Sequence, residues 1–141
     1  MSELSFKQVQ AKHSSYYEYL IDGVPLKEIL GASKMESISP FGVWNIERQL
    51  NSILQLQGKA KPTLESGRII FYECPECGDF DCGAVTAEVQ KIGEQKVWRN
   101  FAMENPQGIW FEAFEPIKPI FFDKTQYYNV LEQLKNKLIS Q

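Results

Sequence analysis

Histidine is almost absent from this sequence: the only one is His13, near the beginning of the chain. Nucleophilic catalysis by a Ser–His–Asp or Cys–His arrangement would depend on this residue alone. A lone histidine in such a segment is more often a surface or strand residue than a catalytic base. The glycine patterns of phosphate-binding loops, Gly-x-Gly and Gly-Lys-Ser/Thr, are also missing. These absences favour a protein that is not an enzyme.

Long apolar runs are missing as well. No window approaches the apolar length that spans a bilayer, and the first residues lack the basic segment and apolar run of a signal peptide. The three cysteines cannot all pair within one chain. Without an export signal, we expect them to be reduced thiols or metal thiolates. The sequence therefore predicts a cytoplasmic protein that makes no membrane contact.

Charge is uneven along the chain, whose formal net charge is −3. Residues 1–70 carry eight basic and seven acidic side chains, whereas residues 71–141 carry seven basic and eleven acidic ones. An acidic surface repels nucleic-acid phosphates and accelerates the encounter with a basic protein. The pattern therefore predicts a protein partner and no nucleic acid, although acids that only keep the protein soluble give the same pattern.

Length and composition fit a single domain over residues 1–141 with a β-rich core, because 43% of the residues are hydrophobic and many of these are aromatic. Strands are predicted at 16–21, 68–74, 84–92, 96–103 and 109–114, whereas residues 4–11 are ambiguous. Helices are predicted at 25–30, from Ser39-Pro40 to Gly58, and after Asp123. We therefore expect an α+β fold in which an antiparallel β-meander sheet is covered on one face by two main helices.

Each main helix has a predicted apolar stripe at three- and four-residue spacing. The stripe of the earlier helix consists of Val43, Ile46, Leu50, Ile53 and Leu54, and that of the last helix consists of Tyr127, Leu131, Leu134 and Leu138. We expect both stripes to face the sheet.

The segment Cys74 to Gly83, of sequence CPECGDFDCG, joins two predicted meander strands. Cys74, Cys77 and Cys82 have a spacing that suits a zinc knuckle, with His13, an aspartate or a water as the fourth ligand. A redox role for the Cys-x-x-Cys pair is less favoured, because no helix follows and nearby carboxylates oppose thiolate formation. A third interpretation is a tight connection that holds three reduced, buried cysteines.

This motif resembles that of a group of small bacterial proteins, many without assigned function, that carry CPECGDxxCG in a β-hairpin. Here the motif is followed by Ala84-Val85-Thr86 and later by Trp98-Arg99-Asn100-Phe101. The resemblance covers about a quarter of the chain and implies a shared fold, but no activity. In size, acidity and lack of catalytic motifs, the chain also resembles immunity proteins of contact-dependent and related bacterial toxin systems.

The resulting hypothesis is a non-enzymatic bacterial binding protein, in the first place an immunity protein that binds and neutralises a basic toxin domain. Its partner-binding residues would be the four acids among the cysteines, Glu73, Glu76, Asp79 and Asp81. The alternative is a small zinc-binding module, structural or weakly catalytic, that uses Cys74, Cys77 and Cys82. The protein would hold no cofactor in the first case and one zinc ion in the second.

Overall fold

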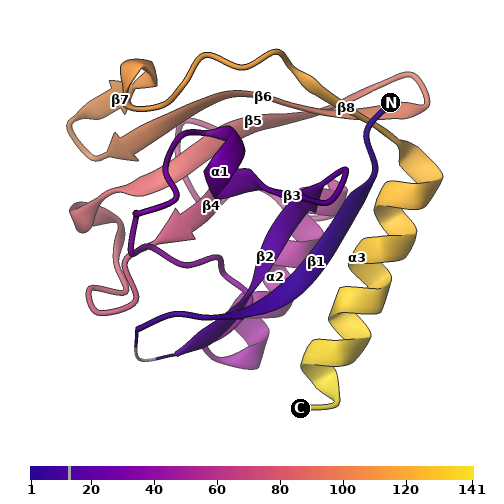
Figure 1. The fold of residues 1–141 in the computed structure, drawn as a ribbon, viewed down its shortest axis with the longest axis horizontal. Helices are drawn as coiled ribbons and strands as arrows, with labels where there is room; N and C mark the ends of the chain where they lie inside the picture. Colours follow the sequence, from indigo (N-terminus) through magenta and orange to yellow (C-terminus); the bar gives the residue numbers. More distant parts are fainter. Residues whose placement is uncertain (13) are drawn as a thin grey trace.

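Five antiparallel strands form the larger of two sheets (Figure 1). The structure, a computed structural model, describes residues 1–12 and 14–141. The larger sheet consists of β4 (Ile69–Glu73), β5 (Ala84–Ile92), β6 (Gln95–Asn105), β7 (Gly108–Trp110) and β8 (Ile120–Asp123). Strand β6 pairs with β5 along one edge, and along its other edge with β8 near its beginning and β7 near its end. The predicted β-meander is confirmed.

A smaller sheet precedes it in the chain and is not predicted by the sequence. It contains β1 (Leu4–Gln10), β2 (Ser15–Ile21) and β3 (Val24–Pro25), all antiparallel. Strand β1 coincides with the ambiguous segment 4–11, in which Leu4 is the one fully buried residue. The strand is therefore defined by its pairing with β2 and not by an alternating apolar pattern of its own.

The two long helices are α2 (Ile46–Gln57) and α3 (Lys124–Ile139), and a single short turn forms α1 (Leu26–Ile29). Two short 3-10 turns, η1 (Phe80–Cys82) and η2 (Phe111–Ala113), lie in connections. All three α-helices and the smaller sheet lie on the same side of the larger sheet in Figure 1. Buried side chains from α2, α3 and both sheets belong to one hydrophobic cluster. The predicted cover of one sheet face by two main helices is thus confirmed.

Aromatic rings at the centre of this cluster join the layers. The fully buried indole of Trp98 in β6 packs edge-on against Phe71 in β4 and Phe122 in β8, with centroids 4.8 Å apart in both pairs. Its Nε1 donates a hydrogen bond to Tyr127 Oη (3.0 Å), which in turn donates to Leu56 O in α2 (2.7 Å). One chain of hydrogen bonds therefore connects the larger sheet to both long helices.

Helix α3 forms as the sequence predicts. Asp123 caps its first turn by accepting a hydrogen bond from the Gln126 backbone N–H (3.0 Å). The Gln126 side chain does not complete a capping box, because it bonds the backbone of Leu4 instead. All members of the predicted stripe, Tyr127, Leu131, Leu134 and Leu138, are buried.

The beginning of α2 differs from the prediction. The helix starts at Ile46 after an Asn45 cap, and Ser39-Pro40 lies outside it. The buried Ser39 hydroxyl donates to Tyr17 O (2.7 Å) and accepts from the Phe41 N–H (3.2 Å), so its bonds lie in a turn before the helix and not at the helix cap. Of the predicted stripe, Ile53 is fully buried, whereas Val43 and Ile46 are 44% and 41% exposed. The predicted helix end at Gly58 is confirmed by its left-handed C-cap.

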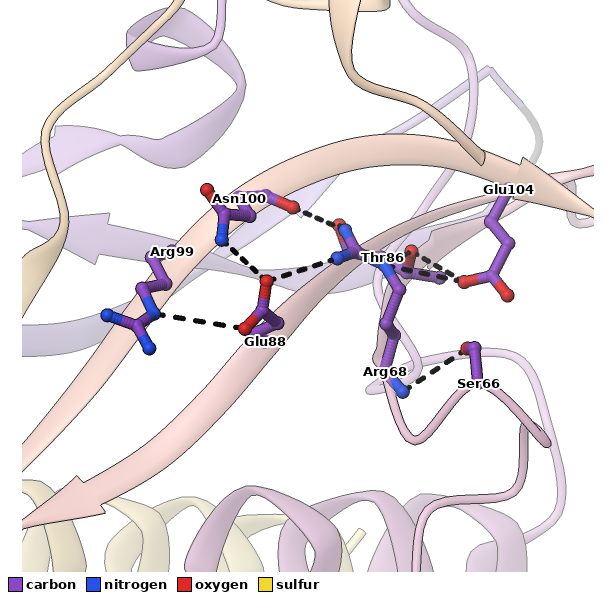
Figure 2. A network of polar contacts seen from close by, with 7 residues as sticks. All are labelled: Ser66, Arg68, Thr86, Glu88, Arg99, Asn100 and Glu104. Carbon is purple, nitrogen blue, oxygen red and sulfur yellow. Dashed lines mark hydrogen bonds and ion pairs between the residues drawn. The ribbon is translucent and has the colours of Figure 1, made fainter. Parts of the chain in front are cut away.

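Across the larger sheet from the aromatic core, a polar network surrounds Arg68 (Figure 2). Strand β5 sends Val85 into the core, so its neighbour Thr86 faces the other side of the sheet. The register between β5 and β6 shifts after Thr86, which leaves carbonyl oxygens without ladder partners. The Arg68 guanidinium donates to Thr86 O (2.9 Å) and to Asn100 O, and it pairs with Glu104 (3.5 Å). Its buried charge is thus matched at the irregular point of the sheet.

Candidate functional site: the cysteine loop and the adjoining pocket

Residues 74–83, called the cysteine loop below, connect β4 to β5 as predicted. Its beginning is fastened to a distant segment by two backbone hydrogen bonds, Ile38 N to Glu73 O (2.8 Å) and Glu73 N to Ile38 O (2.9 Å). At its end, a side chain on Gly83 would approach Met103 Cε to 3.3 Å, and the residue has a φ of +93° that glycine tolerates. The beginning of the loop is therefore bonded to the body of the protein, and its end is a position that favours glycine.

Within the loop, Cys77 and Cys82 form a disulfide, and Cys74 is a free, partly exposed thiol. The Gly78 N–H bonds to Cys74 O (3.2 Å), and Asp79 accepts a hydrogen bond from Asp81 N (3.0 Å) as the cap of η1. These short turns bring the two sulfurs together. The expectation of three reduced cysteines is therefore wrong for this pair, and a disulfide is typical of oxidising compartments. The expected cytoplasmic location stays a prediction.

The described part of the chain offers no complete set of zinc ligands. The disulfide removes two of the three proposed thiolates, and only Cys74 remains. Among residues 1–12 and 14–141, no three His, Cys, Asp or Glu side chains are grouped so that they could hold a metal ion. His13, the proposed fourth ligand, lies outside the described residues.

Glu73 differs from the other three proposed partner-binding acids. Its side chain is only 4% exposed and accepts a hydrogen bond from Arg48 Nη2 of α2 at 2.5 Å. Burial raises the pKa of the Glu73 carboxyl, and the adjacent Arg48 lowers it by a smaller amount. Glu73 thus anchors the loop to α2 and is not available to a partner, which corrects the sequence-based assignment.

Glu76, Asp79 and Asp81 lie on the exposed side of the loop. None of them forms an ion pair with any residue that the structure describes. The Cys77–Cys82 disulfide and the hydrogen bond from Asp81 N to Asp79 restrict the backbone that carries them. The loop therefore presents three unpaired carboxylates on a fixed frame.

An apolar patch adjoins these acids. Val43 and Ile46 are exposed, and the Trp44 ring between them stacks with the Arg48 guanidinium, whose Cζ lies 4.4 Å from the ring centroid. The Trp44 indole nitrogen lies near Gly78 of the cysteine loop, where an added Cβ would meet it at 3.8 Å. Two residues assigned to the buried helical stripe, Val43 and Ile46, are thus exposed instead, and Val43 lines a pocket together with Glu76 of the loop.

A pocket of about 600 Å³ opens beside the loop, and Val43 of the apolar patch and Glu76 of the loop line part of it. Its walls come from the connection between β1 and β2, from residues 33–37 after α1, and from Cys74-Pro75-Glu76. Lys27 and Tyr16 also line it and are both buried. The walls contain both apolar and polar side chains, as those of small-molecule pockets do.

Lys27 contributes a buried cation to this pocket. Its Nζ donates to Met35 O (3.0 Å) and lies 5.1 Å and 5.4 Å from the ring centroids of Tyr16 and Tyr72. Burial lowers the pKa of the Lys27 ammonium, and the charge of Glu18 opposes that shift. Burial also raises the pKa of Tyr16 to about 12, with a further contribution from Glu18. The pocket therefore combines a desolvated ammonium with the ring of Tyr16, and the Tyr72 ring lies near the same ammonium.

Glu18, whose charge acts on Lys27 and Tyr16, is itself buried. Its Oε1 accepts hydrogen bonds from Tyr72 Oη (2.5 Å) and from the Tyr19 backbone N–H (2.8 Å). Burial raises the pKa of the Glu18 carboxyl, and these hydrogen bonds and Lys27 offset part of the shift. Sequence reasoning missed both Glu18 and Lys27, although a glutamate within the aromatic strand SYYEYLI is an available signal of a buried polar group.

No protein-family model, curated protein or solved structure matches this chain. In the described part of the structure, no helix has both the length and the apolar character needed to cross a membrane.

Proposed function

We propose that this chain is a non-enzymatic binding protein whose cysteine loop docks on a basic protein domain. Among such proteins we favour an immunity protein, which would bind a toxin domain and block it. The observation that carries the proposal is the set of three exposed carboxylates, Glu76, Asp79 and Asp81, on a disulfide-closed loop beside the exposed Val43 and Ile46.

Charge and rigidity both support docking at this loop. Unpaired carboxylates steer a basic partner and raise its association rate. A loop that is already ordered loses little conformational entropy when it binds, so more of the contact energy appears as affinity. The disulfide between Cys77 and Cys82 and the anchor between Glu73 and Arg48 supply this order.

The adjoining apolar patch supports a protein partner over a purely solubilising role for the acids. Protein interfaces combine an apolar centre, often with an aromatic residue and arginine, with a polar rim. Val43, Ile46 and the stacked pair of Trp44 and Arg48 fit such a centre, and the acids of the loop fit the rim. Acids that only keep the protein soluble would not need an apolar patch beside them.

The test uses the product of the adjacent gene as the candidate partner. Binding is measured for the wild-type chain and for a loop variant that combines Glu76→Lys, Asp79→Asn and Asp81→Lys. Asparagine at position 79 keeps an oxygen that can cap η1. We expect the variant to bind at least about tenfold more weakly at low salt, because its electrostatic attraction is lost.

A control variant changes the net charge by the same amount at exposed sites away from the loop: Glu65→Gln, Glu94→Lys and Glu112→Lys. We expect this control to bind like the wild-type chain. Absence of binding to the product of the adjacent gene, or an equal loss in both variants, would contradict the proposal.

A further inference from the structure

We infer that the pocket beside the cysteine loop binds a small monocarboxylic acid with an apolar body, and that Lys27 receives its carboxylate. This goes beyond the proposed docking function, because the ligand is a small molecule and its contact is the buried Lys27, not the exposed acids.

The first observation is that the buried Lys27 ammonium has no carboxylate in direct ion-pair contact, although the charge of Glu18 lies near enough to act on it. The residue is 9% exposed and lines the pocket. An ammonium has three N–H donors, and the described residues supply one acceptor, Met35 O, at 3.0 Å. No carboxylate in the described part of the chain lies within ion-pair distance of it. A buried cation of this kind is costly unless an anion or further acceptors complete its shell.

Glu18 does not take this role. Its carboxyl accepts hydrogen bonds from Tyr72 Oη and from the backbone N–H groups of Tyr19 and Lys27, but it forms no ion pair with the Lys27 ammonium. The ammonium instead lies near the rings of Tyr16 and Tyr72. Rings stabilise the cation through their π-faces, which is a weaker compensation than an ion pair. The remaining donors of Lys27 are thus free to bind an anion that enters the pocket.

A single buried cation favours a monoanion. Among the described residues, the charged side chains that line the pocket are Lys12, Lys27, Glu36 and Glu76, and of these Lys27 alone is buried. Lys27 can compensate one negative charge in the interior, whereas a second charge would have no buried cation and would be repelled by the exposed Glu36 and Glu76. No arginine lines the pocket to offer the forked hydrogen bonds typical of phosphate sites. A carboxylate is therefore the better match than a phosphate.

The size and the other walls specify the rest of the ligand. A volume of about 600 Å³ lies in the usual range for small-molecule sites. Ala11, Met35, Val43 and Pro75 supply apolar surface around the opening to Lys27. A small aromatic or aliphatic acid would place its body against these residues and its carboxylate at the ammonium.

The test compares benzoate with its neutral analogue benzamide by NMR titration of the wild-type protein. Benzoate is expected to bind with a dissociation constant below about 5 mM and to shift the amide signals of Lys27 and Met35. Benzamide is expected to bind about 10- to 100-fold more weakly, because it cannot form a charge-assisted hydrogen bond with the ammonium.

Two lysine variants locate the effect. Lys27→Met keeps the length of the side chain and removes the charge, so it should abolish the preference for benzoate, whereas Lys137→Met on exposed α3 surface should keep it. If circular dichroism shows that Lys27→Met is unfolded, the comparison of benzoate with benzamide on the wild-type chain tests the inference by itself. The inference is overturned by equal binding of the two ligands, by no binding of benzoate, by shifts outside the pocket, or by tighter binding of inorganic phosphate. Asp81→Asn should leave benzoate binding intact, so a failure of the docking proposal and a failure of this one are distinguishable.

Discussion

Replacement of Arg68 by methionine should strongly destabilise the larger sheet. The Arg68 side chain is 6% exposed, and the side chain of its partner Glu104 is 7% exposed. Methionine keeps much of the apolar volume but removes the donors that bind Thr86 O (2.9 Å), Thr86 Oγ1 (2.8 Å) and Asn100 O. The Glu104 carboxylate would then be a buried charge with only the Thr86 hydroxyl as a donor (2.9 Å).

The expected cost follows from these contacts. Removing one partner of a buried ion pair costs about 3–5 kcal/mol, because the other charge remains desolvated. The free energy of unfolding, measured by urea denaturation at pH 7, should fall by about that amount. The double variant Arg68→Met/Glu104→Gln should recover part of the loss, since no uncompensated charge remains.

Arg99 provides the matched control on the same sheet. Its Nε lies 3.8 Å from the Glu88 carboxylate, and the two side chains are 38% and 33% exposed. Arg99→Met should therefore change the stability by less than about 1 kcal/mol. A loss below about 1 kcal/mol in Arg68→Met, or equal losses in the two variants, would refute the electrostatic account of this network.

Three further predictions concern the core, the buried acid and the thiols. Tyr127→Phe should lower the free energy of unfolding by about 1–3 kcal/mol, because the Trp98 indole N–H loses its acceptor; an unchanged urea midpoint would argue against the hydrogen-bond chain. For Glu18, a raised pKa means that the folded state favours the protonated acid, so wild-type stability should fall relative to Glu18→Gln as pH rises from about 4 to 7. A difference that is independent of pH, or that grows in the opposite direction, would contradict this sign. Titration of the denatured, non-reduced protein should detect one free thiol, that of Cys74, and titration after reduction should detect three. Three free thiols without reduction would rule out the disulfide.

Local patterns predicted helix α3, whose buried residues share one face, from its helical spacing and the Asp123 cap. Strand β5 also falls at its predicted bounds, although residues on both of its faces are buried in its first half. The α+β class and the meander follow from these elements and their turns. The beginning of α2 was mispredicted because Ser39-Pro40 looks like a helix start, whereas tertiary contacts use the Ser39 hydroxyl elsewhere. Strand β1 was missed because pairing with β2 defines it.

The candidate site was only partly predictable for the same physical reason. The cysteine loop is local, and its position between two strands follows from its own turn residues. The burial of Glu73 depends on Arg48, and the pocket depends on Lys27 meeting Tyr16 and Tyr72, all through contacts between distant segments. A single sequence contains no sign of which distant segments meet, so these features required the structure.

The most direct test of docking through the cysteine loop is the salt dependence of the association rate with the product of the adjacent gene. For the wild-type chain, the rate constant should fall by about tenfold or more between low and near-physiological ionic strength, because salt screens the attraction of Glu76, Asp79 and Asp81. The loop variant should associate slowly at both ionic strengths, with little dependence on salt. Equal rate constants and equal salt dependence in the two proteins would contradict the account.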